Sequence, residues 1–381
     1  MNLGLLAWVH VGRGRPLPLP GEITRGIHAI RIRHSDRRPS GCEVTFRIGR
    51  QSQLGLPSFD HERAAAQLRQ GNRISVTARI TVAPVQLFDG VIAERAFALG
   101  DEPGTSTLTI RCRDLSLLMD LHEEDQIFPN RSDAEIVEDI LDGYQAQGVQ
   151  KRVTRPSVES RRNADDTVPE QRATDLQHLR ALAERNGFVF YLQPGAAPGQ
   201  SVAVWGPEPR LGTPRAALAV DMGPFTNATN FRVTAREEVG VVITGTNRDA
   251  TTGQPVPITT SPFSLDPPLA SVPAVATSPE LVRTRRLEET NQDAALAVAR
   301  AQARANSVAD GAVRATCSVD VARLGRVLLP WQTVEVRGAG EHDGAWYVEE
   351  VRHDLEPGRF EQAVTLRRGG SWALSPRVSA P

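Results

Sequence analysis

Two parts of the chain alternate apolar and polar residues with a period of two, a pattern typical of half-buried β-strands. The first part runs from Ile27 to Ile110, where glycine and asparagine turns separate the runs. Within it, residues 60–70 predict a short helix, because an aspartate opens an alanine-rich segment and Gly71 follows its end. We therefore expect a first β-barrel domain at residues 1–114.

A helical period replaces this pattern after Arg113. Ser132 and Glu135 match a capping box, in which a hydroxyl and a carboxylate satisfy the free amides at a helix start. Thr174 and Gln177 match a second one. Each box precedes an apolar face with helical spacing, so the sequence predicts two amphipathic helices.

Short strands accompany these two helices. The apolar runs at residues 188–192 and 201–205 have the length of buried strands. The arginine-rich segment 151–171 between the helices is expected to be a surface loop. Together these elements predict a small α/β insert domain at residues 115–210.

The period of two returns at Asn227 and continues to the last strands of the chain. Residues 251–279 are rich in proline, serine and threonine and are expected to form a loop or arm. Residues 291–307 are rich in alanine and predict a helix, whose small side chains should let it pack closely on a sheet. We expect a second β-barrel domain at residues 211–381 that carries this arm and this helix.

Three segments near the C-terminus repeat the pattern of three segments in the first part. In each set a strand leads to a polar turn, an Asp-Gly pair opens a second strand, and a third alternating strand follows: residues 73–76, 88–92 and 107–111, and residues 332–336, 343–349 and 363–367. Asp-Gly is a common turn pair, so one copy would carry little information. Two copies in the same order predict one β domain used twice around the insert, although a generic meander remains an alternative. The expected fold class is thus α+β, mainly β.

Composition excludes several kinds of chemistry. The 44 basic and 45 acidic residues give a formal charge of −1, so we expect no sequence-specific nucleic-acid binding. Lys151 is the only lysine, and no glycine-rich phosphate loop precedes it. Cys42, Cys112 and Cys317 form no C-x-x-C pair and no two of the 8 histidines lie four apart, so neither a metal site nor a cofactor is expected. No segment approaches the roughly 18 apolar residues of a membrane-spanning helix, so we expect no membrane anchor.

Two acidic clusters are the remaining catalytic candidates, since paired carboxylates can divide acid and base chemistry. One comprises Glu123, Glu124 and Asp125, and the other lies at residues 341–343. Both occupy polar stretches between apolar runs and are expected to be solvated turns. Because the sequence also lacks a nucleophile elbow and a dinucleotide fingerprint, we expect no catalytic residue and no enzyme activity.

The segment from Ala173 to Tyr191, with the sequence ATDLQHLRALAERNGFVFY, carries a family resemblance. It resembles the helix-then-strand signature of the late control protein D family, the baseplate hub proteins of contractile phage tails, which is related to the N-terminal part of the type VI secretion spike protein VgrG. Residues 112–119 and 132–141 support the resemblance, and the order of segments agrees from about Ile27 to Arg368. One departure is Pro330-Trp331-Gln332, which stands where the family usually has a Pro-Gly turn.

The resemblance implies a non-enzymatic hub. In that family three copies form a ring, and two similar barrels in each copy match a hexameric tail tube to a threefold central spike. The implied partners are two further copies of the chain, the tail tube protein, other baseplate proteins and a spike made by a separate chain, since this sequence ends at Pro381 soon after the second β domain. The implied location is the bacterial cytoplasm during assembly and then a phage tail or tail-like particle.

Two other functions stay open from the residues alone. One is a tail-associated cell-wall hydrolase that uses Glu123, Glu124 or Asp125, and the other is a β module that binds a glycan or a receptor. The arginines near the N-terminus either meet acidic partner surfaces or form a solvated charged face; they are Arg13, Arg15, Arg25, Arg31 and Arg33.

Overall fold

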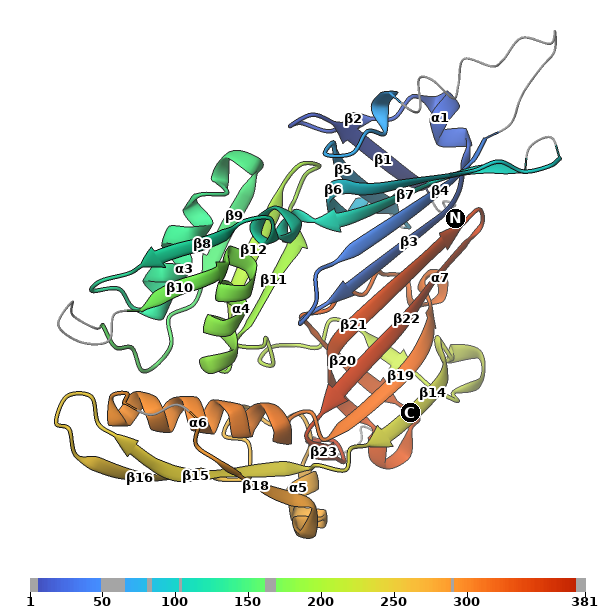
Figure 1. Cartoon of the computed structure of the whole chain (residues 1–381). Coiled ribbons are helices and arrows are strands. Elements are labelled where there is room, and N and C mark those ends of the chain that lie inside the picture. The colour runs from blue at the N-terminus through green and yellow to red at the C-terminus, as the bar shows by residue number, and fades with distance from the viewer. Residues whose placement is uncertain are drawn as a thin grey trace, which may run out of the picture.

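The structure is a computed structural model that describes residues 6–48, 66–80, 84–102, 105–161, 169–288 and 291–374 (Figure 1). Strands outnumber helices in these residues, so the prediction of a mainly β chain with helices is confirmed. The helix expected at residues 60–70 falls largely outside the described residues, of which 66 and 67 are helical.

The largest element is one sheet of 13 strands. The first part of the chain contributes β1 (Leu6–Gly12), β2 (Leu17–Pro18), β3 (Ile27–Ser35), β4 (Gly41–Ile48), β5 (Arg73–Arg79), β6 (Pro84–Ala98) and β7 (Ser106–Asp114), with the short helix α1 (Gly21–Arg25). The last part contributes β13 (Ala217–Ala219), β14 (Ala228–Ala235), β19 (Val313–Asp320), β20 (Thr333–Arg337), β21 (Gly344–Glu356) and β22 (Arg359–Arg368), with α7 (Val321–Leu324).

The strands pair along a path that does not close. The order is β14-β19-β22-β21-β3-β4-β7-β6-β5-β1-β2, and β20 and β13 continue from β21. Two separate closed barrels were expected, but among the described strands β3 of the first part pairs with β21 of the last part. The β3 edge, which could have closed the first barrel, thus joins the first half of the sheet to the second, as the diagonal sheet in Figure 1 shows. We call this β3–β21 contact the joint.

Each half of the sheet contains the same ladder of five strands. The first ladder is β5-β6-β7-β4-β3 and the second is β20-β21-β22-β19-β14, with antiparallel pairing throughout. A register shift falls at the corresponding place in both, between Ile92 and Glu94 in β6 and between Val348 and Glu350 in β21. The duplication predicted from the sequence is therefore present in the strand pairing.

The residue match within the duplication differs from the prediction by two positions. Val76 pairs with Phe88 in the first ladder, and Val336 pairs with Gly344 in the second, so Phe88 rather than Gly90 corresponds to Gly344. Asp89 and Gly90 do not form a turn but lie inside β6. The predicted turn is wrong there because buried donors satisfy the Asp89 carboxylate, as described below.

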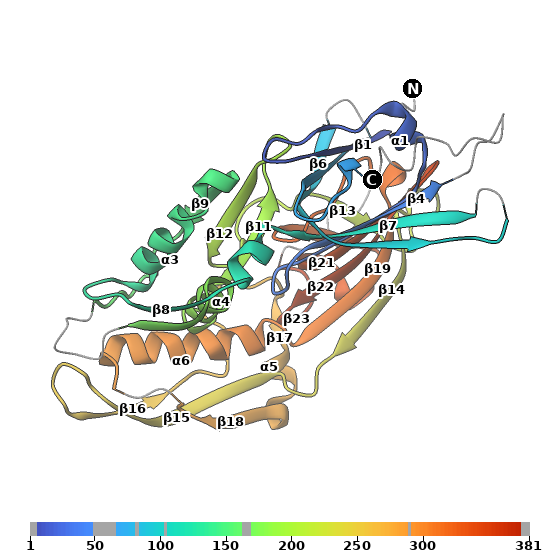
Figure 2. The same ribbon diagram turned by 45° about the horizontal axis from the view of Figure 1, so that its top comes forward.

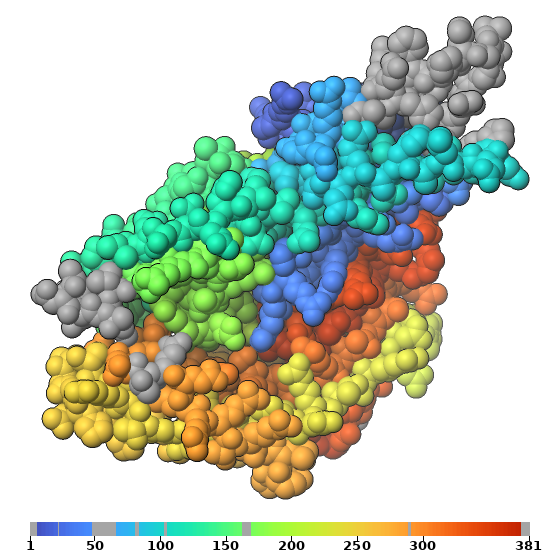
Figure 3. All heavy atoms as spheres, in the orientation of Figure 1, coloured from blue at the N-terminus to red at the C-terminus, as the bar shows by residue number. Residues whose placement is uncertain are grey.

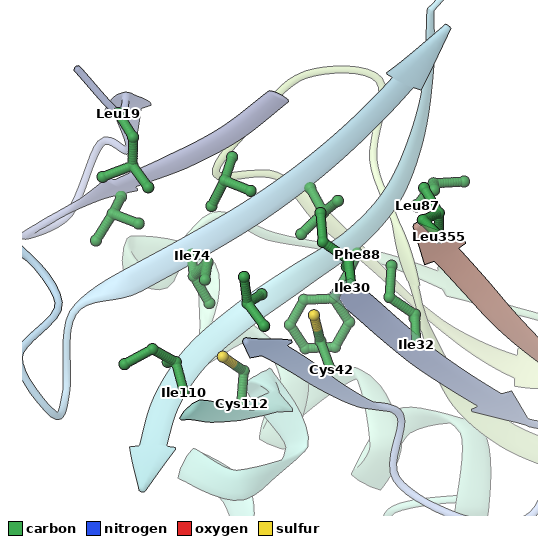
Figure 4. Close-up of a cluster of buried hydrophobic side chains, with 14 of the residues drawn as sticks. Leu19, Ile30, Ile32, Cys42, Ile74, Leu87, Phe88, Ile110, Cys112 and Leu355 are labelled. Carbon is green, nitrogen blue, oxygen red and sulfur yellow. The ribbon is translucent and has the colours of Figure 1, made fainter. Parts of the chain in front are cut away.

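A single apolar core lies against the first ladder. Figure 4 shows its side chains gathered between β3, β4, β6 and β7, with the sulfur atoms of Cys42 and Cys112 inside the cluster. Cys42 and Cys112 are direct cross-strand neighbours, a proximity that their sequence spacing does not reveal, and all three cysteines are free and buried. Leu355 and Phe360 of the second half also belong to this core, so the two ladders share buried surface.

The segment between the ladders forms a small α/β unit. Its sheet has the order β11-β12-β9, and a separate ribbon pairs β8 with β10. The elements are η1 (Leu115–Asp120), β8 (Glu123–Ile127), α3 (Asp133–Asp142), η2 (Gln145–Gln147), β9 (Val149–Val153), β10 (Glu170–Thr174), α4 (Asp175–Arg185), β11 (Val189–Pro194) and β12 (Ser201–Gly206).

Both predicted helix starts in this unit are confirmed. Ser132 and Glu135 form the reciprocal capping box of α3, and the Thr174 hydroxyl accepts from the amide of Gln177 (3.3 Å) at the start of α4. The surface loop expected at residues 151–171 is wrong at both ends, because β9 and β10 occupy them and pair with β12 and β8.

The remaining segment forms a third unit below the insert (Figure 2). Its sheet has the order β16-β15-β18, covered by the long helix α6. The elements of this unit are β15 (Gly240–Arg248), β16 (Pro255–Thr259), β17 (Val272–Pro273), α5 (Ala274–Thr277), η4 (Pro279–Leu281), β18 (Val282–Arg286) and α6 (Ala294–Ala309). Outside it, η3 (Gly223–Phe225) precedes β14, η5 (Gly340–His342) precedes β21, and β23 (Gly370–Ser371) follows β22 and pairs with β17.

Two expectations change in this third unit. The arm expected at residues 251–279 contains β16, β17 and α5, and its irregular middle follows α6, where the amide of Ser261 donates to the side chain of Gln302 (2.9 Å). The alanine-rich helix exists, but it packs on β15 rather than on the large sheet. Three buried alanines on one face make that contact: Ala297, Ala301 and Ala305.

A bulky side chain on this face should disturb the packing. We expect Ala301→Leu to lower the free energy of unfolding by about 1–3 kcal/mol, because Ala301 is buried in the cluster that joins α6 to β15 and its small side chain lets the helix approach the sheet. Ala295→Leu is the matched control, since Ala295 lies exposed on the same helix. Urea unfolding followed by circular dichroism measures both variants, and equal stability of the two would contradict this packing.

Candidate functional surfaces

The first acidic cluster lies on an exposed ribbon. Glu123, Glu124 and Asp125 belong to β8 and are all exposed, opposite Thr174, Ala173 and Arg172 of β10. Alternation along the strand puts Glu124 on the face opposite to the other two. The predicted turn is wrong, because these residues form a strand, while the predicted solvation is confirmed.

The second cluster, residues 341–343, forms the predicted turn before β21. The Asp343 carboxylate accepts from the amide of Ala339 (2.6 Å), and the Arg368 guanidinium donates to the carbonyl oxygens of Glu341 and Asp343 (2.9 Å each). The cluster therefore contributes carbonyl and carboxylate contacts to a closed turn.

In the described part of the chain, no group of three His, Cys, Asp or Glu side chains is placed to hold a metal ion. Within the same residues, no helix is both long enough and apolar enough to cross a membrane.

A cleft of about 1210 Å³ lies between the insert and α6. Figure 3 shows the insert and the third unit meeting along this boundary. The two units touch closely at one end of it, where a Cβ on Gly187 (φ +67°) would lie 2.6 Å from that of Ala303. Nearby, Asp133 at the start of α3 accepts from Arg185 (2.9 Å) and from Arg300 of α6 (2.9 Å). We interpret the cleft as the seam between two packed units.

A buried ion network connects four parts of the chain beside this seam. Its carboxylates are Asp36, which follows β3, Glu208, which follows β12, and Asp310, which follows α6. Arg210 lies 2.7 Å from Asp310 and 2.9 Å from Glu208, and Arg367 of β22 pairs with Glu208 and lies 3.5 Å from Asp36. No sequence motif marks this network, because its members are far apart along the chain.

The network sets the charge states of its members. Burial alone would raise the pKa of Glu208, but Arg367 and Arg210 hold it below its usual value. Burial raises the pKa of Asp36 to about 6, even though Arg367 counteracts this. Glu208 is thus the ionised partner of the two arginines.

Two buried histidines meet at the joint. The rings of His34 and His353 pack edge to face at 5.4 Å, and Nε2 of His34 hydrogen-bonds the carbonyl oxygen of Leu87 (2.7 Å). Burial lowers the pKa of His34 to about 4 and the pKa of His353 well below its usual value. Both imidazoles are therefore neutral at pH 7.

This joint should lose stability in mild acid. Between pH 6.5 and 4 the unfolded chain binds a proton on each of the two histidines, whereas the folded chain does not. Each histidine therefore lowers the free energy of unfolding by about 1.4 kcal/mol per pH unit as the pH falls. Asp36 has the opposite effect and raises the free energy of unfolding as the pH falls. Its raised pKa lets the folded chain bind a proton below pH 6, whereas the unfolded carboxyl binds one only near pH 3.8. These three groups together predict a net loss of about 1.4 kcal/mol per pH unit from pH 6 to 4.

Asp36→Asn tests this balance, because it removes the opposing group. We expect the loss of stability per pH unit from these groups to be about twice as steep in the variant as in the wild type. Urea unfolding at pH 7, 6 and 5 measures both chains. Parallel curves for the two chains would contradict the assignment.

Trp331 adds an aromatic contact beside the joint. It adopts a left-handed backbone (φ +64°), the conformation that a glycine adopts most easily. Its ring stacks on Tyr191 of β11 with centroids 4.2 Å apart. Trp331 thus connects the segment before β20 to the insert.

The arginines near the N-terminus divide into two groups. Arg33 donates two hydrogen bonds to Glu350 across the joint (3.0 and 2.8 Å), and Arg31 lies 3.7 Å from Asp354. These two therefore meet acidic residues of the same chain. Arg13, Arg15 and Arg25 are exposed, as a solvated face requires.

Two strand edges within the repeated ladders of the large sheet are exposed. β14 ends the path and has a partner only on its β19 side among the described strands. Residues 94–98 of β6 pair with β7, but no described strand lies on their other side. Large apolar side chains are exposed here, with Phe97 at 56% and Leu99 at 77%. Exposed edges of this kind are sites where another strand can pair.

Comparisons with known proteins address the fold. Residues 31–205, from β3 to β12, match the family model of the Alg8 N-terminal domain. No curated protein matches the sequence. A tail protein from Neisseria meningitidis is similar in structure, with a TM-score of 0.63 and 13% identity over 97% of this chain and 98% of that one.

Two further solved structures are similar. The 43 kDa tail protein of a Shewanella oneidensis prophage has a TM-score of 0.58 and 16% identity over 95% of this chain and 98% of its own. An E. coli component of the type VI secretion system, described as structurally similar to two bacteriophage T4 tail proteins, has a TM-score of 0.51 and 13% identity over 92% and 77%. The resemblance found in the sequence is thus confirmed as a structural match, and the chain has the fold of phage tail proteins and type VI hub proteins.

Proposed function

We propose that the chain is a structural baseplate hub protein of a contractile tail or contractile injection system. In this proposal three copies form a ring that adapts a hexameric tail tube to a threefold central spike. The repeated five-strand ladder is the observation that carries the proposal, supported by the likeness in fold to tail proteins.

The repeat explains how one chain can serve two symmetries. A ring of three chains, each with two similar ladders, presents six similar β units to a sixfold partner while remaining threefold to the other side. The ladders correspond to the two β-barrel domains expected at residues 1–114 and 211–381, around the insert at residues 115–210. The joint would then be an internal version of the contacts around the ring.

The remaining parts of the proposal concern partners and chemistry. We propose that the tail tube protein, a separate spike chain and other baseplate proteins bind this ring, which assembles in the bacterial cytoplasm. The proposed role needs no catalytic residue, and the exposed positions of Glu123, Glu124 and Asp125 give no enclosed setting in which paired carboxylates could act.

A deletion in the producing bacterium tests the proposal. Without the chain, we expect tubes and spikes to remain unassembled, and in purified particles cryo-electron microscopy should show three copies between tube and spike. Normal particles in the deletion strain, or six equivalent copies, would contradict it.

The acidic ribbon provides the test against the hydrolase alternative. Alanine at Glu123, Glu124 and Asp125 together should leave particle assembly and cell killing or injection unchanged. A wild-type chain that clears peptidoglycan, with a triple variant that assembles but does not, would establish the hydrolase instead, and capture on a glycan array would favour the binding module.

A further inference from the structure

The joint gives a strand pairing that the two exposed edges can repeat. Within one chain, residues 350–355 of β21 pair antiparallel with residues 30–35 of β3, so that Glu350 faces Ser35 and His353 faces Ile32. Within one chain, this contact pairs β21 of the second ladder with β3, the edge strand of the first ladder.

The register of the two ladders identifies the corresponding residues. Cross-strand partners continue from Ile32 to Cys42 to Cys112 in the first ladder, and from Val233 to Ala315 to Leu366 in the second. Ile32 of β3 therefore corresponds to Val233 of β14. On β6 and β21 the shared register shift makes Glu94 correspond to Glu350.

These correspondences fall on the two exposed edges. The counterpart of the β3 strand in the joint is β14, and the counterpart of residues 350–354 is the free edge at residues 94–98 of β6. β14 is mostly exposed along its length, and residues 94–98 are all exposed. Each edge thus lacks, within the described chain, the kind of partner that its counterpart has in the joint.

We propose that β14 of one copy pairs antiparallel with residues 94–98 of β6 in a second copy, in the register of the joint. Phe97 of the second copy then faces Val233 of the first copy, as His353 faces Ile32 within the chain, and Ala96 faces Thr234. The contact rests on the proposed ring, and it names the surface by which one copy meets the next.

The side chains fit this register. Phe97 and Val233 take the places of His353 and Ile32, which are both buried in the joint, so pairing would cover a phenylalanine that is 56% exposed in a single chain. At the end of the contact Glu94 faces Arg236, which places opposite charges on paired positions. The same alternation of apolar and polar positions thus continues from the joint to the new contact.

The contact is head to tail, because one copy offers β14 and the other offers β6. A pair of copies joined in this way still has one free β14 edge and one free β6 edge, so further copies can add. The copies form a ring if the rotation from one copy to the next brings the last copy back to the first. Every ladder in the ring would then have a strand partner on this edge.

Cysteine crosslinking tests the register. A chain with Ala96→Cys and Thr234→Cys should form intermolecular disulfides under mild oxidation, since directly opposed strand residues come within disulfide distance. A chain with Ala96→Cys and Arg232→Cys is the matched control, shifted by two residues on the same exposed face. We expect about tenfold more crosslinked product from the first chain on non-reducing gels. The native cysteines are buried and give a low background.

A second measurement does not depend on added cysteines. Phe97→Asp should shift the sedimentation of the purified chain from oligomer to monomer, whereas Leu121→Asp, at a side chain 57% exposed in the insert, should not. Purified particles repeat the crosslinking test with the chain in its assembly.

The outcomes separate this inference from the proposed function. Crosslinks only from the in-register pair, with loss of the oligomer in Phe97→Asp, support the contact. An oligomer or a particle without the in-register crosslink, or with equal crosslinking from both pairs, overturns the contact and leaves the hub proposal standing. The hub proposal fails separately, when particles assemble normally in the deletion strain.

Discussion

Asp89→Ala is expected to lower the free energy of unfolding by about 3–5 kcal/mol, because it removes the anion from a buried ion pair. The Asp89 side chain is fully buried, and the partner guanidinium of Arg73 is 7% exposed. Loss of the carboxylate therefore leaves a cation in a place that water does not reach, which costs more than loss of an exposed pair.

The contacts of Asp89 explain why the effect should extend to the insert. Besides Arg73, the carboxylate accepts from Ser75 Oγ (2.5 Å), from the amide of Gly199 (3.1 Å) and from Ser201 Oγ (2.6 Å). The last two belong to the turn and the strand that end the insert's sheet. One carboxylate thus fixes the insert against β5 and β6.

Two measurements check this prediction. Urea unfolding gives the free energy, and hydrogen exchange should show faster exchange around Gly199 and Ser201 than in β19 or β22. Asp142→Ala is the matched control, because Asp142 is 45% exposed and pairs with Lys151 at the surface. An Asp89→Ala chain as stable as this control would show that the insert is held by other contacts.

Local signals predicted the insert well. Ser132 with Glu135, and Thr174, mark their helix starts within a few residues, and the hydrogen bonds that they make are short-range. The sequence did not predict β9 and β10, because their residues are mostly polar and do not alternate with apolar ones. They form strands because they pair with β12 and β8. Their pairing depends on tertiary contacts that the sequence pattern does not contain.

The duplication was predicted, but its register was not. Asp-Gly pairs suggested the alignment, and one of them lies inside β6, where Asp89 serves buried donors and Gly90 allows the backbone of Arg113 to approach. A Cβ on Gly90 would lie 2.1 Å from the carbonyl oxygen of Arg113. One Asp-Gly pair thus lies inside a strand and the other lies at the start of a strand, and only the strand pairing distinguishes the two cases.

The joint and the ion network were not predictable from pattern. Ile30 pairs with Leu355, a separation at which periodicity carries no information. The prediction of two closed barrels assumed that the edge strands within each half pair with each other. In the structure β3 of the first half pairs instead with β21 of the second half. The network arginines were hidden by composition, since almost every basic residue in this chain is arginine and no spacing distinguishes the buried ones.

Arg367→Met is expected to lower the free energy of unfolding by about 3–5 kcal/mol as well. The Arg367 side chain is 2% exposed, pairs with Glu208, lies 3.5 Å from Asp36 and covers the ring of Tyr347 at 4.7 Å. Methionine keeps much of the volume, so the loss should come mainly from two carboxylates left in a buried setting. The stability of the variant should therefore improve in mild acid relative to the wild type, as the carboxyls bind protons.

A double variant separates charge from packing in this network. Adding Glu208→Gln to Arg367→Met removes the carboxylate that Arg367 pairs with, and replacing a buried pair with neutral groups of similar size is often close to neutral. We therefore expect the double variant to recover a substantial part of the stability that Arg367→Met loses. Arg359→Met on the same strand is the matched control, because Arg359 is 60% exposed and its pair with Glu361 should contribute little. If the double variant is less stable than Arg367→Met alone, Glu208 stabilises the chain through Arg210 rather than through Arg367. The attachment of the second ladder to the insert must then depend on apolar contacts such as the stacking of Trp331, just before β20, on Tyr191.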